Sequence, residues 1–540
     1  MILEYKFDYR SSSPIYERIF LNQLKEFNLK GNIVKNHFEL KLYVEASTPD
    51  ELKEFATSFS NALPHSIFLY GIEASMVEEM PIKPYKLIED KRVPSPPCPK
   101  CLNEIQKSYN IFVSCDICGY HIEGKKRNFK EEILKTAKKI GDGKVVELNT
   151  FYGKYFVGIP SSICNSIEFD ILAYDLATIE RYAYVEEYEL KALASFEKPS
   201  IRLKKRLKFN IDYRDIEVEL IRFRLPDDAI LYLLMQELHT LGVDTLFISK
   251  DRVDIDDRLL LTEIENELEP IEVVASPKHI IILKGNRGLS KIDKEIDIVN
   301  PQIDKFYSVT KEHNLLDRFE NLAGVNLDKN FSNIIIQGKK FGLIEYLSFE
   351  SSFNSIYEIF NQIKSTDRQG DRLLSNFEKK FPQHYNRIIK IKFDNSSFNI
   401  YRLWGLIATV LNFTDSTNPL EAVEILEENA LCFLGKKGPR IDYRVINRNG
   451  KPYFNPLMTI RTAISFKLAG ADKLGLSYGI IESFLEFITN ELDDLKQTMN
   501  IEAVVVTGSL LGNRKIFSKI SQEISKNHNI YFNNEIRVLD

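Results

Sequence analysis

Four cysteines in two pairs are the residues whose types and spacing point to chemistry. Cys98 and Cys101 form one Cys-x-x-Cys pair, and Cys115 and Cys118 form a second. A Cys-x-x-Cys turn lets two sulfurs reach one ion, and two such turns supply the four thiolates of a tetrahedral Zn²⁺ site. The sequence therefore predicts a structural zinc site made by these four residues.

Two disulfides, or unpaired buried cysteines, are the alternatives for the same residues. Disulfides belong to oxidising compartments, and the N-terminus shows no signal-peptide core. Gly119 follows the second pair and suits a tight backbone turn. Because all four ligands come from the protein, the zinc would stabilise a loop-rich segment without catalysing a reaction. His121 stands nearby as a surplus residue that we expect at the surface.

The composition is that of a soluble globular protein of several domains. The chain has 540 residues, of which 44% are hydrophobic and 28% charged, enough for about three to four domains. Its net charge of -5 argues against a general nucleic-acid-binding protein. The most apolar run, Leu403–Leu411, is far shorter than the ~20 residues that a membrane helix needs. We expect a cytoplasmic protein without membrane insertion.

The N-terminal part alternates between strand and helix patterns. Polar and apolar residues alternate from Leu3 to Tyr9 and from Phe38 to Val44, as in half-buried strands. Ser13-Pro14 predicts the start of one helix, with Ser13 as its cap, and the capping box Thr48-Pro49-Asp50-Glu51 predicts a second. A last strand is expected from Ser66 to Ile72. The order β-α-β-β-α-β is typical of the ferredoxin-like fold.

The rest of the chain reads as a linker followed by alternating α/β segments. Prolines in residues 81–97 indicate the linker, and Lys126–Ile140 has the pattern of a basic helix. A later α/β segment ends with a strand over Ala503–Thr507, the loop Gly508-Ser509 and a helix. The basic run Lys198–Lys208 could contact phosphate or RNA, but we favour a solvated strand face.

Several short segments along nearly the whole chain carry a resemblance to a known family. Cys98-Pro99-Lys100-Cys101-Leu102 is similar to its Cys-Pro-Asp-Cys-Leu, and Phe27-Asn28-Leu29-Lys30-Gly31 to its Leu-Gly-Leu-Lys-Gly turn. Further similar segments are Pro199-Ser200-Ile201-Arg202-Leu203, Leu225-Pro226, Lys329-Asn330, Gly508 and Asn513-Arg514. In this order they resemble HypF, the carbamoyltransferase of [NiFe]-hydrogenase maturation.

The resemblance implies a multidomain α/β protein of four parts. These are an acylphosphatase-like domain with the ferredoxin-like fold over residues 1–85, a single zinc-knuckle segment over 92–125, a YrdC-like domain over 126–300 and a TsaD-like, ASKHA-type domain over 301–540. It also implies ATP and carbamoyl phosphate as ligands, if the family's activity is retained. Its implied partners are hydrogenase-maturation proteins or a [NiFe]-hydrogenase subunit.

The residues that would carry this activity depart from the family's pattern. The anion loop Arg10-Ser11-Ser12-Ser13-Pro14 has no glycine, although an acylphosphatase holds phosphate with a glycine-rich loop and an arginine at a helix start. The family's Thr-Ser-Gly-Asn is Ile248-Ser249-Lys250-Asp251, and Cys164-Asn165-Ser166-Ile167 stands where a basic cluster is expected. The eight histidines are far apart, and the family's second set of cysteine pairs is missing. We therefore predict an accessory or scaffold factor with degenerate catalytic sites, and we assign no catalytic residue.

Two alternatives stay open, and with them the question of whether the chain is an enzyme. The first is an active carbamoyltransferase whose phosphate ligands are Lys250, Arg10 or the run Lys204-Lys205-Arg206, with Arg18 as a further candidate in the anion loop. The second is RNA binding or tRNA modification, because YrdC-like and TsaD-like modules also occur in enzymes that modify tRNA and zinc knuckles can bind nucleic acid. The acidic net charge argues against this second alternative.

Overall fold

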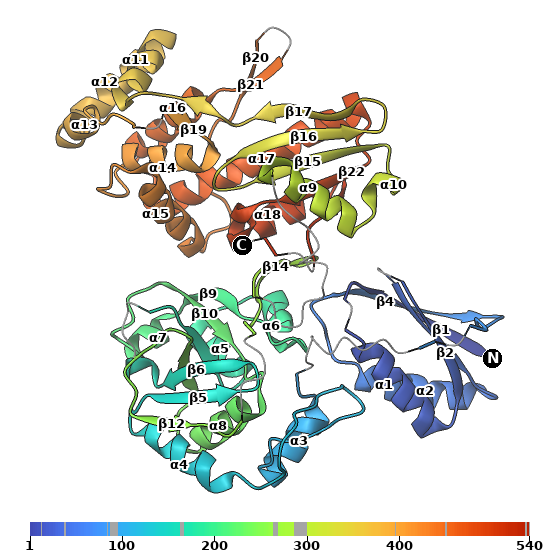
Figure 1. Cartoon of the computed structure of the whole chain (residues 1–540). Helices are drawn as coiled ribbons and strands as arrows, with labels where there is room; N and C mark the ends of the chain where they lie inside the picture. Colours follow the sequence, from blue (N-terminus) through green and yellow to red (C-terminus); the bar gives the residue numbers. More distant parts are fainter. Residues whose placement is uncertain are drawn as a thin grey trace. The chain divides into compact units, whose positions relative to one another are not determined.

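The structure is a computed structural model in which the chain divides into two units. It describes all residues except 12, 37–38, 84, 87–95, 163–166, 263–267, 286–299, 395, 449–450, 535–536 and 539–540. The first unit consists of Met1–Ala275 and His279–Glu295, and the second of Ser276–Lys278 and Ile296–Asp540. Figure 1 draws the first unit in blue to green and the second in yellow-green to red.

The N-terminal module is an antiparallel sheet in the order β2-β3-β1-β4, with two helices on one face (Figure 1). Its elements are β1 (Ile2–Tyr9), α1 (Ile15–Phe27), β2 (Lys30–Lys35), β3 (Glu39–Glu45), α2 (Pro49–Ala62) and β4 (Leu69–Val77). The predicted ferredoxin-like fold is confirmed. The capping box at the start of α2 is also present, because the Thr48 hydroxyl accepts from the Glu51 N–H while the Glu51 carboxylate accepts from the Thr48 N–H.

Two details of this module differ from the prediction. Helix α1 begins at Ile15, and Ser13 does not cap it, because Pro14 occupies the N-cap position and no side chain accepts a capping hydrogen bond. The last strand is β4 rather than Ser66–Ile72. Ser66 instead lies in a turn, where its carbonyl accepts from the Leu69 N–H (3.2 Å).

A segment that contains the four paired cysteines and a larger module complete the first unit. The larger module has an eight-stranded mixed sheet in the order β12-β5-β6-β11-β7-β10-β9-β8, and α4 packs against α8 beside it. The elements are α3 (Pro99–Ser108), α4 (Lys130–Gly141), β5 (Val146–Thr150), β6 (Gly153–Gly158), β7 (Asp170–Ala173), α5 (Leu176–Tyr182), β8 (Ala183–Tyr184), α6 (Glu187–Ala194), β9 (Ile201–Lys205), α7 (Leu207–Asp212), β10 (Leu220–Arg224), α8 (Ala229–Thr240), β11 (Thr245–Ser249), β12 (Asp257–Leu259), β13 (Glu272–Ala275) and β14 (Ile280–Lys284). The helix expected over Lys126–Ile140 therefore begins four residues later, after Phe129.

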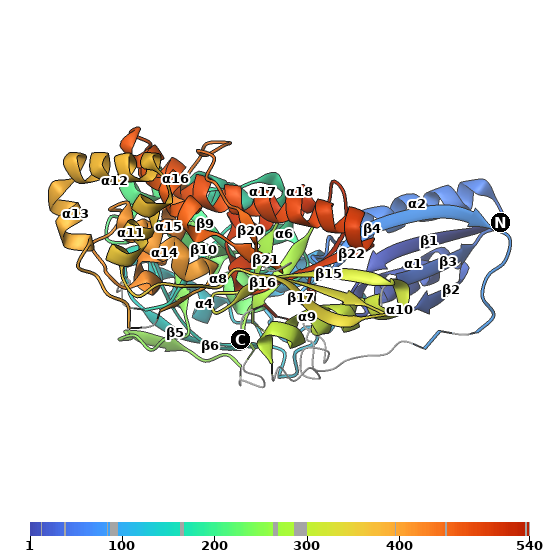
Figure 2. The ribbon, with the colours of Figure 1, turned by 90° about the horizontal axis from the view of Figure 1, so that it is seen from above.

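The second unit is built on a five-stranded sheet in the order β17-β16-β15-β22-β23. Strands β17, β16 and β15 are antiparallel, whereas β22 and β23 run parallel to β15. Figure 2 shows α9 and α17 on opposite faces of this sheet. The strand expected over Ala503–Thr507 is confirmed as β22.

The remaining elements of the second unit are mostly helices inserted between β17 and β22. The bounds in this unit are α9 (Pro301–Glu312), α10 (Leu315–Arg318), β15 (Asn321–Leu327), β16 (Ser332–Gly338), β17 (Gly342–Ser348), β18 (Ser351–Ser352), α11 (Ile356–Thr366), α12 (Arg368–Lys380), α13 (Pro382–Ile388), β19 (Ser397–Phe398), α14 (Ile400–Val410), α15 (Pro419–Cys432), β20 (Val445–Arg448), β21 (Lys451–Phe454), α16 (Pro456–Leu468), α17 (Lys473–Met499), β22 (Ala503–Thr507), α18 (Arg514–Ile524) and β23 (Asn529–Tyr531). The apolar run Leu403–Leu411 is buried in α14, where it packs against α15. Within the described part of the chain, no helix has both the length and the apolar character needed to span a membrane.

Aromatic side chains fill the core of the N-terminal module. The ring of Phe59, on α2, lies 5.1 Å from Tyr5, 5.7 Å from Phe20 and 5.6 Å from Phe55, measured between ring centroids. All four side chains are buried. Phe59 therefore joins both helices to the sheet.

We expect Phe59→Ala to destabilise this module by about 3–5 kcal/mol, because it removes a buried ring and leaves a cavity. The measurement is native-state hydrogen exchange of the full chain, read over residues 1–80. The matched control is Leu21→Ala on α1, whose side chain is exposed. Equal loss of protection from hydrogen exchange in both variants would contradict the central packing role of Phe59.

Candidate functional site

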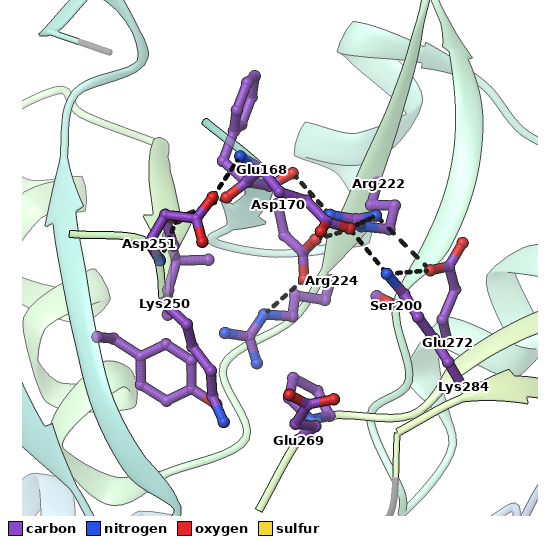
Figure 3. Close-up of a pocket in the computed structure, with 15 residues that line it drawn as sticks. Glu168, Asp170, Ser200, Arg222, Arg224, Lys250, Asp251, Glu269, Glu272 and Lys284 are labelled. Carbon is purple, nitrogen blue, oxygen red and sulfur yellow. Dashed lines mark hydrogen bonds and ion pairs between the residues drawn. The ribbon is translucent and has the colours of Figure 1, made fainter. Parts of the chain in front are cut away.

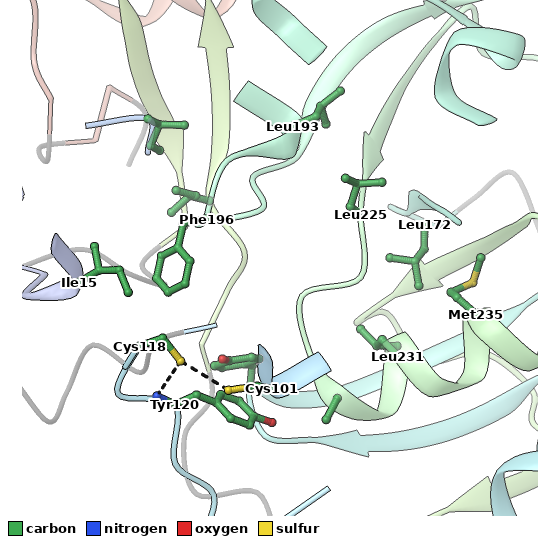
Figure 4. Close-up of a cluster of buried hydrophobic side chains, with 14 of the residues drawn as sticks. Ile15, Cys101, Cys118, Tyr120, Leu172, Leu193, Phe196, Leu225, Leu231 and Met235 are labelled. Atoms are coloured by element: carbon green, nitrogen blue, oxygen red, sulfur yellow. Dashed lines mark hydrogen bonds between the residues drawn. The ribbon is translucent and has the colours of Figure 1, made fainter. Parts of the chain in front are cut away.

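The four predicted cysteines lie together in the first unit. Their sulfurs are all within 4.8 Å of one another, and Cys101 Sγ lies 3.6 Å from both Cys98 Sγ and Cys118 Sγ. A tetrahedron with metal–sulfur bonds of ~2.3 Å has sulfur–sulfur edges of ~3.8 Å, whereas a disulfide measures ~2.05 Å. The arrangement fits a tetrahedral metal ion such as Zn²⁺ and excludes disulfides among these four residues. Figure 4 shows Cys101 and Cys118 beside Tyr120.

Short local structure brings the two pairs together. Cys98 is the N-cap of α3, so Cys101 comes from the first turn of that helix. Sequence patterns gave no sign of α3. The second pair lies in a turn closed by hydrogen bonds from the Gly119 N–H to the Cys115 carbonyl (2.9 Å) and from the Cys115 N–H to the Tyr120 carbonyl (2.8 Å). Gly119 adopts φ +77°, as the turn requires.

The knuckle is packed into the first unit and is not an independent appendage. Tyr120 is buried, and its N–H donates to Cys118 Sγ (3.4 Å). Tyr109, at the end of α3, donates to Glu237 on α8. His121 is exposed, stands 3.6 Å from Glu123 and is not part of the cysteine group. A bound metal would therefore stabilise the contacts between α3, the turn and α8.

A polar cavity of about 220 Å³ lies at the centre of the eight-stranded sheet. It is bounded by β6, β7, β10 and β11 and by the segment that leads into β13 and β14 (Figure 3). The lining residues are Tyr155, Glu168, Phe169, Asp170, Ser200, Arg222, Arg224, Ile248, Ser249, Lys250, Asp251, Glu269, Pro270, Glu272 and Lys284.

The two arginines of this cavity are held by carboxylates. The register of β10 and β7 places Arg222 beside Asp170, and their side chains lie 2.6 Å apart. Arg222 also lies 2.6 Å from Glu168. The buried Arg224 guanidinium is 3.4 Å from Asp170 and 2.9 Å from the buried Asp227. Burial opposes the charge of Arg222, but the carboxylates of Asp170 and Glu272 raise its pKa above the ordinary arginine value.

Lys284 extends the same network from β14. Its ammonium group lies 2.7 Å from Glu168 and 3.6 Å from Glu272. The hydrogen bond from Lys284, assisted by the charge of Arg222, lowers the pKa of Glu168 to about 2. Burial raises the pKa of Glu272, although Arg222 and Lys284 oppose that shift. The cavity lining thus contains four cationic side chains and five carboxylates.

The segment Ser249-Lys250-Asp251 closes the cavity on the side of β11. The Ser249 hydroxyl donates to the Glu168 carbonyl and accepts from the Asp251 N–H (3.0 Å). The Asp251 carboxylate accepts from the Glu168 N–H (2.8 Å). Lys250 lies over the Tyr155 ring and donates to the Leu268 carbonyl (3.2 Å). Ser249 and Asp251 therefore fix the position of the Glu168 backbone.

Comparison with known proteins identifies the architecture. No protein-family model matches the chain. Protein HydE of Wolinella succinogenes is 26% identical over 562 residues, which span 98% of each chain. The crystal structure of full-length HypF in the phosphate- and nucleotide-bound form superposes with a TM-score of 0.61 at 14% identity, covering 100% of this chain and 96% of that one. HypF of T. kodakarensis gives a TM-score of 0.64 at 12% identity, with 100% and 97% covered.

The chain has the HypF fold over its whole length. The predicted fold class, with its acylphosphatase-like and YrdC-like parts, is thereby confirmed. Ile248-Ser249-Lys250-Asp251, which the sequence resemblance predicts to correspond to the family's Thr-Ser-Gly-Asn segment, lines the cavity of the YrdC-like part. Cys164-Asn165-Ser166, expected near the same place, lies outside the described residues.

The basic run of β9 does not reach the cavity. Lys205 is buried, and its ammonium donates to the Ile216 carbonyl (2.7 Å), so the expectation of a fully solvated strand face is wrong at this residue. Lys204 and Arg206 lie over the ring of Tyr184. These three residues therefore have structural contacts, and only Lys250 among the predicted phosphate ligands lines the cavity.

The segment Arg10–Pro14, predicted from the resemblance to be an anion loop, is surrounded by other contacts. Arg10 forms a two-pronged pair with Asp8, with distances of 2.8 and 3.0 Å. A Cβ added at Gly119 would lie 2.9 Å from Arg18 Nε, so the Arg18 guanidinium lies against the cysteine turn. In the first turn of α1, the buried Glu17 carboxylate is 2.6 Å from the Lys35 ammonium. The Lys35 ammonium also donates to the Ser13 carbonyl (3.3 Å), so the Glu17 carboxylate lies close to this segment.

The histidines are dispersed, as the sequence indicates. Among the residues that the structure describes, the four cysteines are the only group of His, Cys, Asp or Glu side chains placed to share one metal ion. His313 is buried and bonds to the Phe532 carbonyl (2.6 Å), and His528 is buried and bonds to Asp493 (2.8 Å). These two histidines have structural roles.

Sequence reasoning missed most of the cavity, including Arg222, Glu168, Glu272 and Lys284. The signal available was weak: in β10, Arg222 and Arg224 stand on either side of Phe223 in an otherwise apolar strand. The ion pairs of the cavity join segments far apart in the chain, and the Lys284–Glu168 bond spans 116 residues.

We expect Cys101→Ser to lose about one metal ion per chain, because the site loses one of its four thiolate ligands. The segment around the cysteines should also lose stability, because a structural metal contributes folding free energy directly. The measurement is elemental analysis of protein purified without chelator, together with hydrogen exchange over residues 98–125. Cys432→Ser, at a buried cysteine of α15, should keep the metal. Absence of zinc from the wild-type protein would contradict the site.

We expect Glu168→Gln to weaken the docking of β14 in a pH-dependent way. The folded-state pKa of about 2 lies below the ordinary 4.5, so the ion pairs stabilise the fold above pH 4.5 and this contribution is lost as the pH falls. Hydrogen exchange of β14 should be faster in the variant near neutral pH, and the difference should shrink as the pH is lowered from about 5 to about 3. Glu54→Gln on the exposed side of α2 is the control. If the exchange of β14 differed between variant and wild type by the same factor at every pH, the charge of Glu168 would not be what stabilises β14.

Proposed function

We propose that this protein is an accessory or scaffold factor of [NiFe]-hydrogenase maturation that keeps the HypF architecture without its phosphate chemistry. The observation that carries the proposal is the charge balance of the cavity in the YrdC-like part. Four cations face five carboxylates there, and Arg222, Arg224 and Lys284 are each within 3.4 Å of a carboxylate. To bind these cations, a triphosphate or carbamoyl phosphate would have to displace the carboxylates, whose negative charge would also repel it.

The other two places where the family's chemistry would occur support the same proposal. In the anion loop, Arg10 is paired with Asp8 and the Glu17 carboxylate is buried nearby. Backbone N–H groups and an arginine stabilise a phosphate in such a loop, whereas a buried carboxylate repels it. In the second unit, the described histidines form no metal-binding group.

The partners we propose are hydrogenase-maturation proteins or a [NiFe]-hydrogenase subunit. This part of the proposal rests on the likeness to HypF, which covers the full length of the chain. We further propose that the ion held by Cys98, Cys101, Cys115 and Cys118 is zinc with a structural role, because four thiolates fill its coordination shell and leave no open position.

The alternative is an active carbamoyltransferase with substituted ligands. The observation in its favour is Lys250, which lines the cavity beside the Ser249 hydroxyl. In such an enzyme, Lys250 would have to bind the phosphates without the basic cluster that the family is expected to have. The negative charge of Asp251, the next residue, would repel those phosphates. The balance of charge therefore favours the accessory role.

The test is incubation of the metal-loaded protein with ATP and carbamoyl phosphate, with AMP and pyrophosphate release measured. We expect no release above the protein-free control and no ATP binding by calorimetry. Release dependent on carbamoyl phosphate would establish the alternative.

In a deletion strain we expect reduced hydrogenase activity, and unchanged activity would overturn the biological role.

A gain-of-binding variant tests the physical reason. Glu168→Gln combined with Glu272→Gln removes two negative charges from the partners of Arg222 and Lys284. We expect this variant to bind ATP at least about tenfold more tightly than the weakest affinity that calorimetry detects, whereas the wild type shows no binding, because the cations become available to phosphate. The matched control, Glu54→Gln with Glu350→Gln, changes net charge equally at exposed positions. The same affinity in all three proteins would show that charge pairing is not what excludes phosphate.

A further inference from the structure

A basic loop in the second unit presents cations that pair with no carboxylate among the described residues. The loop spans residues 433–441, between α15 and β20, and reads Phe433-Leu434-Gly435-Lys436-Lys437-Gly438-Pro439-Arg440-Ile441. Lys436, Lys437 and Arg440 are all exposed, and none forms an ion pair with a described residue. The loop thus carries three positive charges within five residues, in a chain whose net charge is -5.

The basic loop is anchored at both ends on α17. At its start, the Phe433 ring stacks on Tyr478, with ring centroids 5.0 Å apart. At its far end, the Ile441 N–H donates to the Ser483 hydroxyl (2.9 Å). In the middle, the Gly438 N–H donates to the buried Glu482 carboxylate (2.9 Å). The backbone of the loop is therefore held at three points along one helix.

Glycine on both sides allows the loop to lie directly on the helix. A Cβ added at Gly438 would be 2.4 Å from Gly479 Cα, and one added at Gly479 would be 2.4 Å from the Pro439 carbonyl oxygen. No side chain fits between the two backbones. Because the loop is held in place before any partner binds, binding would not have to order its backbone.

The nearest carboxylates are already committed to other groups. Glu482 accepts from the Gly438 N–H and pairs with Lys519 (2.9 Å), which also lies 3.6 Å from Glu486. Asp442, just beyond the loop, pairs with Arg444 (2.8 Å). These contacts leave the positive charge of Lys436, Lys437 and Arg440 facing solvent.

We propose that the basic loop is a docking surface for an acidic segment of a partner protein. Complementary charge accelerates association and selects partners. Leu434 lies beside the cations with 60% of its surface exposed, and it offers the apolar contact that a peptide side chain can use. Single-stranded RNA would need exposed aromatic rings for base stacking, but Phe433 and Tyr478 stack on each other and Tyr478 is buried. The loop therefore fits an acidic peptide better than RNA.

This inference goes beyond the proposed function and does not depend on it. The basic loop belongs to the second unit, whereas the cavity that carries the proposed function belongs to the first. ATP turnover would contradict the proposed function but would leave binding at the basic loop untouched. Failure of the loop to bind a peptide would say nothing about ATP turnover. The two proposals are therefore overturned by different experiments.

The test is fluorescence anisotropy of a labelled oligoglutamate peptide titrated with the full-length protein. We expect saturable binding that weakens as salt is raised, because exposed charges are screened over about 10 Å at 0.1 M ionic strength. The triple variant Lys436→Glu, Lys437→Glu and Arg440→Glu should weaken binding at least about tenfold. Gly438→Ala, which keeps every charge but lifts the loop from α17, should weaken it severalfold.

A matched control separates this surface from general charge effects. Lys340→Glu, Lys379→Glu and Lys390→Glu change the net charge equally at other exposed positions of the second unit, and these should bind the peptide as the wild type does. Equal weakening in both triple variants, or no binding by the wild type, would overturn the proposal. Binding of labelled oligouridylate, lost in the loop variant, without binding of oligoglutamate would also overturn it in favour of RNA.

Discussion

Neutralising Arg222 is the constraint that organises the YrdC-like part. This guanidinium lies within the sheet between β7 and β9, largely removed from solvent, so its charge requires carboxylates close by. Asp170 on β7, Glu168 just before it and Glu272 on β13 supply them, and Lys284 on β14 then balances the excess negative charge. The network joins three separate segments. Its internal charge balance is the observation on which the proposed lack of phosphate chemistry rests, because cations paired with carboxylates attract phosphate weakly.

Cationic side chains are also paired with carboxylates in the acylphosphatase-like part, but there the pairs are separate and do not form one network. There the charged residues near the anion loop pair within the module, Arg10 with Asp8 and Lys35 with Glu17. In both places the fold of the HypF relatives is kept while the local charge is internally balanced. A fold depends on the apolar core and on sheet register. Replacing site residues therefore changes the fold less than it changes the activity. Retained architecture and altered sites are therefore compatible in one chain.

The cysteine knuckle and the basic loop contrast with these balanced sites. The four thiols converge on one point, and a metal there would hold α3 and the following turn against α8. The basic loop is fixed just as firmly, by Gly438 and Gly479 and by the Glu482 carboxylate, but its cations remain unbalanced. An ordered structural site together with an ordered, unneutralised surface is the combination expected of a protein that acts through binding.

The sequence by itself determined what depends on local spacing. The two Cys-x-x-Cys pairs indicated one metal site, the Thr48 capping box marked α2, and the apolar alternation in β1 and β22 marked those strands, because each signal lies within a few residues. The segments along the chain were enough to indicate the HypF fold. Only the tertiary structure decided the charge balance of the cavity and the burial of Lys205. These depend on side chains that are distant in sequence and adjacent in space, as Lys284 and Glu168 are, and no local pattern records that pairing.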